Sequence, residues 1–92
     1  RDVKILRQWA GICDITPDYA PIMGEVSGIK GFILNCGWGT WGFKAAPAAG
    51  MALAEMIVSE KTPQIIRPFN LSRFSEGRLV NERAAAPAAA VQ

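Results

Sequence analysis

Residues 31–44 read GFILNCGWGTWGFK, and this stretch decides the fold. Its first six residues, 31–36, form a compact apolar run suited to a buried strand. A glycine-rich turn at 37–42 follows at once, and residues 45–60 are rich in the helix-favouring residues Ala, Leu, Met and Glu. The predicted order is therefore strand, glycine-rich loop and helix.

Two prolines bound the helix. Pro47 has no N–H and is tolerated in the first turn, so we expect the helix to begin between Phe43 and Ala46. Pro63 makes Thr62 non-helical. The helix is apolar nearly all round, which predicts a buried helix within a structure larger than 92 residues supply.

The segments before this stretch carry shorter signals. Residues 3–14 place apolar side chains at mostly two-residue spacing and predict one or two strands. Pro17, Asp18 and Pro21 predict a turn, after which residues 22–24 are a short apolar piece and residues 25–30 a hairpin-like loop.

The fold class predicted from these elements is α+β, with short β-strands followed by a glycine-rich loop, one buried α-helix and an irregular arm. Residues 1–60 would form the strand, loop and helix portion of a larger domain. Residues 61–83 show no sustained period and would be the packing arm, and the Ala-rich residues 84–92 a mobile tail.

Composition excludes several classes of function. The chain has no His, so neither a Ser-His-Asp or Cys-His nucleophile nor a His-ligated metal is possible within it. A net charge of +2 with mixed signs does not support nucleic-acid binding, and no apolar run approaches the length of a membrane span. Cys13 and Cys36 have no metal-ligand spacing and are expected to be buried free thiols of a cytoplasmic protein. The opening Arg1-Asp2-Val3 suggests a piece of something longer.

The loop also matches a GxGxxG string at Gly37, Gly39 and Gly42. A dinucleotide fingerprint needs a second strand and an acidic residue about 20 positions on. Glu60 lies near that distance, but its surroundings do not resemble a strand end, and tryptophans inside the motif would crowd a pyrophosphate. A phosphate-binding loop is therefore the less favoured interpretation.

A different resemblance covers residues 1–83. The order of Trp9-Ala10-Gly11, Thr16-Pro17-Asp18, Pro21-Ile22-Met23-Gly24, the GWGTWGFK loop, Pro47 and Gly50 resembles the C-terminal end of D-amino-acid-oxidase-like flavoproteins. Within that family, the likeness is to the beta subunits of heterotetrameric sarcosine oxidases. Such proteins bind FAD through an N-terminal nucleotide-binding unit, which this sequence lacks.

The resemblance implies that the 37–44 loop lies against the flavin ring. Backbone N–H groups at the helix start would then face the N1–C2=O edge, where negative charge accumulates on reduction. Lys44 matches a family lysine that helps hold the substrate carboxylate, and it is the one catalytic residue that we predict. The predicted cofactor-binding residues are Gly39, Thr40, Trp41, Gly42, Phe43 and Lys44, and no metal ligand is predicted.

Each of these residues also has a plain structural interpretation. Lys44 could be a solvated residue, although a cation in the first turn opposes the helix dipole. Trp38 and Trp41 could wall the pocket or belong to the core. Thr40 could bond the flavin or cap the turn. Asp18 is foremost a turn former.

The implied activity is oxidation of sarcosine or a related N-methyl or amino acid by hydride transfer to FAD, with oxygen reduced to hydrogen peroxide. In the heterotetrameric family the complex also carries FMN and NAD, and the partners are the other sarcosine oxidase subunits. The fragment is not expected to be active alone. Two alternatives remain open: a flavin-dependent amino-acid dehydrogenase of the same family, and a small non-catalytic assembly module.

Overall fold

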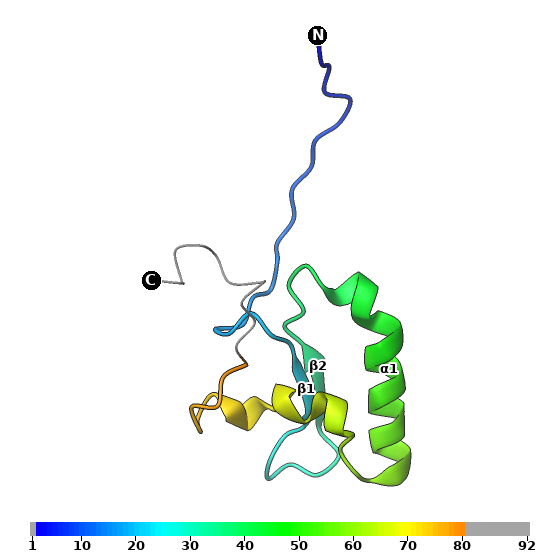
Figure 1. The fold of residues 1–92 in the computed structure, drawn as a ribbon, viewed down its shortest axis with the longest axis vertical. Coiled ribbons are helices and arrows are strands. Elements are labelled where there is room, and N and C mark those ends of the chain that lie inside the picture. The colour runs from blue at the N-terminus through cyan, green and yellow to red at the C-terminus, as the bar shows by residue number, and fades with distance from the viewer. Residues whose placement is uncertain (1, 81–92) are drawn as a thin grey trace.

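The structure, a computed structural model, describes residues 2–80 (Figure 1). Two strands, one α-helix and two short 3-10 helices occur in that range. This arrangement confirms the predicted α+β class. The elements are β1 (Ile22–Glu25), β2 (Ile33–Cys36), α1 (Gly42–Ser59), η1 (Gln64–Phe69) and η2 (Leu71–Arg73).

The two strands form an antiparallel hairpin. Ile22 lies opposite Cys36, and Glu25 lies opposite Ile33. The connecting residues 26–32 are held by backbone hydrogen bonds, including the 2.9 Å bond from the Val26 N–H to the Phe32 carbonyl. The hairpin loop was predicted, and the expected strand at 31–36 is confirmed over its last four residues. Its expected burial is wrong, because two of the four residues are exposed and two are only half-buried.

Residues 2–14 extend away from the rest of the described chain without forming a strand (Figure 1). The prediction of one or two strands here is wrong for this chain, because a strand needs a hydrogen-bonded neighbour and residues 2–80 provide one only at the isolated bridge between Ile15 and Trp38. The apolar side chains of the segment are exposed. Cys13 and Cys36 are free, as expected, but both are exposed rather than buried.

Helix α1 begins at Gly42, one residue before the predicted range. The first intrahelical bond runs from the Ala45 N–H to the Trp41 carbonyl, at 3.1 Å, so Pro47 is the sixth helical residue rather than part of the first turn. The helix accommodates it because only the bond that Pro47 would have donated to the Phe43 carbonyl is lost. At the other end Glu60 adopts a left-handed conformation, with φ 55°, and ends the helix.

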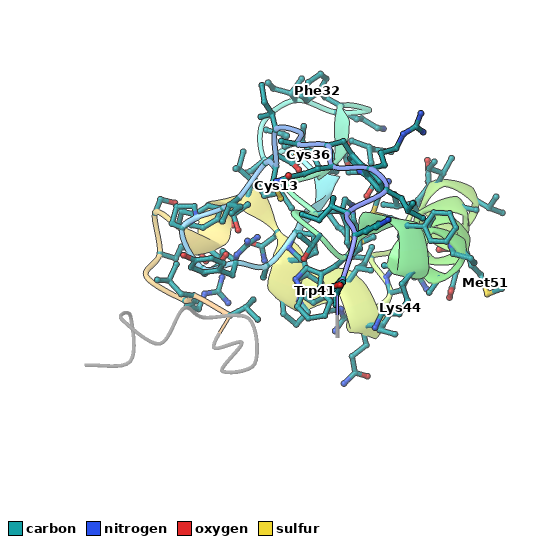
Figure 2. The ribbon with its side chains drawn as sticks, turned by 90° about the horizontal axis from the view of Figure 1, so that it is seen from above. Cys13, Phe32, Cys36, Trp41, Lys44 and Met51 are labelled. Carbon is teal, nitrogen blue, oxygen red and sulfur yellow. The ribbon has the colours of Figure 1, made fainter. Side chains whose placement is uncertain are left out.

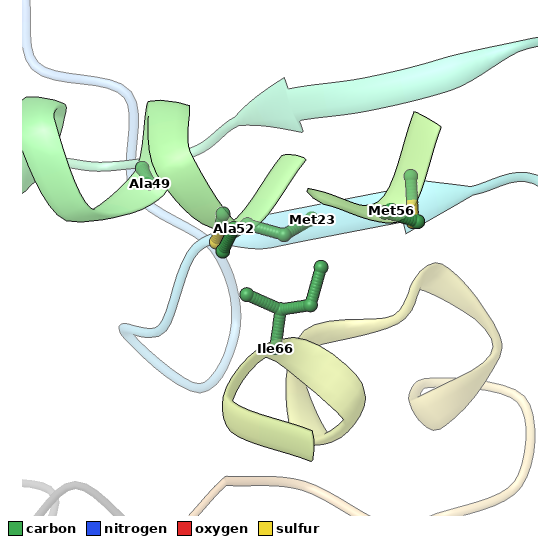
Figure 3. Packing of buried hydrophobic residues seen from close by; sticks show 5 residues of the cluster. All are labelled: Met23, Ala49, Ala52, Met56 and Ile66. Carbon is green, nitrogen blue, oxygen red and sulfur yellow. The ribbon is translucent and has the colours of Figure 1, made fainter. Parts of the chain in front are cut away.

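The core lies where α1 and η1 meet β1 (Figure 3). Its buried members are Met23, Ala49, Ala52, Met56 and Ile66. The expected burial of the helix therefore holds along one face only. The other face is apolar and exposed, and Figure 2 shows Met51, which is 75 % exposed, on the outer side of α1.

Residues 61–80, predicted to be an irregular arm, contain η1 and η2 and pack back on β1. Ile66 of η1 enters the core. The predicted tail at 84–92 lies outside the described residues. Among residues 2–80, no helix combines the length and apolar character that crossing a membrane requires.

Candidate flavin-facing site

The loop between β2 and α1 is fixed by its glycines and by the segment before β1. Gly37 and Gly39 adopt left-handed φ values of 70° and 55°, which L side chains rarely tolerate. The Asp14 carboxylate accepts the Gly37 N–H at 2.8 Å, and Ile15 forms an antiparallel bridge to Trp38. The loop is thus held against residues 14–15 at its first turn.

The start of α1 offers free backbone donors. The Trp41 N–H bonds the Trp38 carbonyl at 2.9 Å, but no side chain caps the helix. Within residues 2–80 the N–H groups of Gly42, Phe43 and Lys44 have no acceptor, as expected for the first turn of a helix. These donors and the positive end of the helix dipole make this end of α1 attractive to an electron-rich group.

Lys44 adds a positive charge to the same end. It lies in the first turn, which contains no acidic residue. Its amine lies 5.7 Å from the centroid of the Trp41 ring, within range of a cation–π interaction. Figure 2 shows the two residues together at the start of α1. A positive charge in the first turn is repelled by the positive end of the helix dipole, so Lys44 does not stabilise the helix. The same charge would attract a bound anion.

Two hollows flank this loop. The first, which we call the loop hollow, has a volume of about 310 Å³ and lies between residues 13–19 and the glycine loop. The second, the aromatic hollow, has a volume of about 210 Å³ and is lined by Tyr19, Ala20, Pro21, Trp38, Trp41 and Phe69. Tyr19 and Trp41 line both hollows, so these two side chains form the boundary between them.

Comparison with known proteins identifies the family. Residues 1–56 match the FAD-dependent oxidoreductase family. This chain belongs to that family. It is 45 % identical over 84 residues to sarcosine oxidase subunit beta of Rhodobacter capsulatus, covering 91 % of this chain and 20 % of that protein. It is 44 % identical over 85 residues to the subunit of the same name from Arthrobacter, covering 92 % and 21 %.

A more distant relative is the human mitochondrial sarcosine dehydrogenase, 32 % identical over 59 residues, which cover 64 % of this chain and 6 % of that protein. The chain spans about a fifth of the length of the sarcosine oxidase beta subunits it matches. The recognition drawn from the GWGTWGFK loop and its neighbouring motifs is confirmed.

The residues at the start of α1 fit the cofactor that the family name implies. Three N–H donors without an acceptor and one lysine ammonium suit the electron-rich edge of a flavin. Beside them Trp41 is 37 % exposed and Phe43 is 99 % exposed, which leaves aromatic surface uncovered at the same end of the helix. A planar aromatic ring system would cover such a surface.

The structure brings together most of the predicted site residues. Gly39, Thr40 and Trp41 line the loop hollow, and Lys44 lies beside Trp41. Gly42 lies close to Trp38, whose Cβ would be 3.3 Å from a Cβ added to the glycine. Gly42, Phe43 and Lys44 line neither hollow. The roles of these residues toward a flavin stay predictions.

The structure bears on the choice between a site role and a plain structural role for Trp38 and Thr40. Trp38 packs against the core cluster and donates its indole N–H to Asn35 Oδ1 at 2.8 Å, and it also lines the aromatic hollow. Thr40 is exposed and makes no capping hydrogen bond to α1. Among residues 2–80, no group of three or more acidic, Cys or His side chains is placed to hold a metal ion.

A buried ion pair beside the site was not predicted. Arg73 of η2 is 1 % exposed, and its Nε donates to Asp18 Oδ2 at 2.7 Å. One terminal nitrogen, Nη2, donates to Asp18 Oδ1 at 2.8 Å and to the Ala20 carbonyl at 2.9 Å. The other, Nη1, donates to the carbonyls of Phe69 and Asn70 at 2.9 and 3.1 Å. All five guanidinium N–H donors are therefore used.

Asp18 is both the predicted turn former and the anchor of this pair. Its carboxylate accepts the Ala20 N–H at 3.3 Å and the Val80 N–H at 3.0 Å. Hydrogen bonds from Arg73 hold the pKa of Asp18 well below its ordinary value, and the two backbone N–H groups act in the same direction against the opposing effect of burial. No local pattern could reveal a pair separated by 55 positions.

Proposed function

We propose that this chain forms one wall of the flavin and substrate site of an FAD-dependent oxidoreductase that oxidises sarcosine or a related N-methyl or amino acid. The observation that carries the proposal is the uncapped start of α1, where three N–H donors and Lys44 directly follow residues 39–41, which line the loop hollow. The similarity to sarcosine oxidase beta subunits supports the choice of substrate.

FAD, when bound, supplies the hydride acceptor and returns the electrons to oxygen, giving hydrogen peroxide. The contribution of this chain is electrostatic. The N–H groups of Gly42, Phe43 and Lys44 are fixed by the helix before the reaction, so they stabilise negative charge on a neighbouring ring edge without reorganising. Gly39 and Thr40, from the adjoining turn, would bring backbone close to the same ring.

Lys44 would bind the carboxylate of the substrate. Its amine lies over the face of Trp41, a residue that lines both hollows, and the first turn holds no acidic residue to neutralise it. A substrate carboxylate placed there gains a charge-assisted hydrogen bond. The aromatic rings nearby would exclude water and strengthen that interaction.

We also propose the setting in which the site works. Residues 1–60 belong to the larger FAD domain, and residues 61–83 pack over it. The partners are the other sarcosine oxidase subunits, FMN and NAD are carried elsewhere in the complex, and the enzyme is cytoplasmic. The similarity to a sarcosine dehydrogenase favours one alternative, in which the electrons pass to a carrier instead of oxygen. Oxygen consumption with sarcosine separates the two.

The substitution Lys44→Met in the flavin-containing holoenzyme tests the proposal. We expect a strong rise in KM for sarcosine, by about tenfold to a hundredfold, with FAD still bound, because one charge-assisted bond to the carboxylate is lost. Lys30→Met is the matched control, since Lys30 is an exposed lysine of the hairpin loop and lines neither hollow. An unchanged KM in Lys44→Met would remove Lys44 from the site.

A further inference from the structure

The arm after α1 (residues 61–80) is hydrogen-bonded to the turn that borders the site. Arg73 donates to Asp18 and to Ala20, the two residues on either side of Tyr19. Tyr19 has a left-handed backbone, with φ 60°, a conformation that is strained for a residue with a side chain. Its side chain lines both the loop hollow and the aromatic hollow. The arginine therefore holds a strained residue at the boundary of the site.

The same contacts continue into the glycine loop through Thr16. The Thr16 hydroxyl donates to the Ala20 carbonyl at 2.6 Å and lies 3.1 Å from Asp18 Oδ1. The methyl group of the same side chain lies 2.6 Å from the position that a Cβ on Gly37 would occupy. Thr16 is 7 % exposed, and its hydrogen bonds fix its rotamer. A displacement of Asp18 would therefore be transmitted through Thr16 to Gly37.

We propose that Arg73 is a positioning residue for the flavin-facing site, acting through Asp18 and Thr16 to set the separation between the Thr16–Ala20 turn and the Gly37–Lys44 loop. The proposal rests on the proposed function, because it assigns the loop to the flavin. If the arm served only to cover the core, one apolar side chain would be enough to anchor it, and Ile66 is already such an anchor. Arg73 instead fixes the orientation of the arm relative to the turn, because its five planar donors meet acceptors on both segments.

The experiment uses the flavin-containing holoenzyme with Arg73→Lys. Lysine keeps the charge but supplies a single ammonium in place of the planar fork, so it cannot satisfy the same acceptors. The matched control is Arg67→Lys on the same arm, since Arg67 is exposed and its side chain donates only to the Thr62 carbonyl among residues 2–80. Two quantities are measured per bound flavin: kcat/KM for sarcosine, and the visible circular dichroism of the oxidised flavin.

We expect Arg73→Lys to retain FAD, to lower kcat/KM by about tenfold and to change the flavin dichroism, because small misplacements of site residues have effects of this size. Arg67→Lys should change kcat/KM by less than about twofold. A purely structural ion pair predicts a different result, in which thermal stability falls while turnover per bound flavin and the dichroism match the wild type. That result would overturn the proposal.

A second variant covers the case in which Arg73→Lys does not fold. Thr16→Ser keeps the hydroxyl bonded to Ala20 but deletes the methyl that abuts Gly37, so it cuts the connection at the loop and leaves the ion pair intact. It should reproduce the loss in kcat/KM and the change in dichroism. Wild-type values of both would refute the role of Arg73.

Failure of the proposed function has its own signature. If sarcosine does not reduce the wild-type flavin, the substrate assignment is wrong whatever the variants do. The dichroism of the oxidised flavin needs no substrate and then decides the positioning role by itself. An unchanged spectrum in Thr16→Ser overturns that role, and an altered one supports it.

Discussion

Substitution of Gly37 by alanine probes the tightest contact of the glycine loop. The new Cβ would lie 2.6 Å from Thr16 Cγ2, a distance that requires one of the two groups to move. Thr16 cannot rotate away freely, because rotation would break the hydrogen bond from its hydroxyl to the Ala20 carbonyl. Gly37 also has φ 70°, which disfavours any side chain.

The expected destabilisation has two parts. The left-handed backbone costs about 1–2 kcal/mol, of which about 0.4–1 kcal/mol is recovered because alanine reduces the entropy of the unfolded chain. Overpacking against a fixed, buried side chain adds about 1–3 kcal/mol. We therefore expect Gly37→Ala to lower the free energy of unfolding by about 1–5 kcal/mol.

The control is Gly28→Ala. Gly28 also has a left-handed backbone, with φ 85°, but no atom lies within 4 Å of its added Cβ. It should lose only the backbone part, about 1 kcal/mol. The assay is urea unfolding of the holoenzyme, followed by flavin release and by circular dichroism of the backbone.

The double variant Gly37→Ala with Thr16→Ser isolates the clash. Deleting the Thr16 methyl opens the space that the new Cβ needs, so the double variant should be more stable than the two single effects added together, by about 1–3 kcal/mol. Equal losses for Gly37→Ala and Gly28→Ala, with no coupling between residues 16 and 37, would refute this account of the loop.

Two further predictions concern the ion pair and the exposed helix face. The pKa of Asp18 is lower in the folded state than its unfolded value of about 3.9, so the stability that the pair contributes is complete above about pH 5 and is lost as the pH falls further. In urea unfolding, the stability difference between wild type and Asp18→Asn should shrink by up to about 1.4 kcal/mol per pH unit below pH 3.9, and a difference that stays constant down to pH 2.5 would contradict this. The 92-residue chain alone should be oligomeric or poorly folded, because Met51, Ile57 and Val58 are exposed on α1. A sharply melting monomer in sedimentation and thermal scans would count against it.

Local signals account for what the sequence predicted well. Pro63, the loop glycines and the Ala-rich helix act on residues close to them in the chain, so the hairpin loop, the glycine turn and α1 could be placed without the structure. The predicted start of α1 was one residue too late. The Trp41 carbonyl accepts the first helical bond, so the helix begins at Gly42 and Pro47 lies deeper in it.

The features that were missed depend on residues far apart in the chain. Residues 3–14 have the alternation of a strand, but the strand is not formed because pairing requires a neighbour that residues 2–80 do not supply. The bond between Asp18 and Arg73 spans 55 positions, and neither residue has a neighbour in sequence that points to the other. For the site, the resemblance identified the loop and the prolines predicted the turn that carries Tyr19, whereas the bonds from Arg73 to that turn came from the structure.

The most direct test of the central claim is an anaerobic titration of the flavin-containing holoenzyme with sarcosine, followed by visible absorbance, for the wild type and for Lys44→Met. The account predicts that the flavin bands of the wild type bleach on addition of sarcosine, and that Lys44→Met needs at least about ten times more sarcosine for the same bleaching. Flavin bands that bleach identically in both proteins would remove Lys44 from the substrate site, and wild-type flavin bands that do not respond to sarcosine would contradict the proposed substrate.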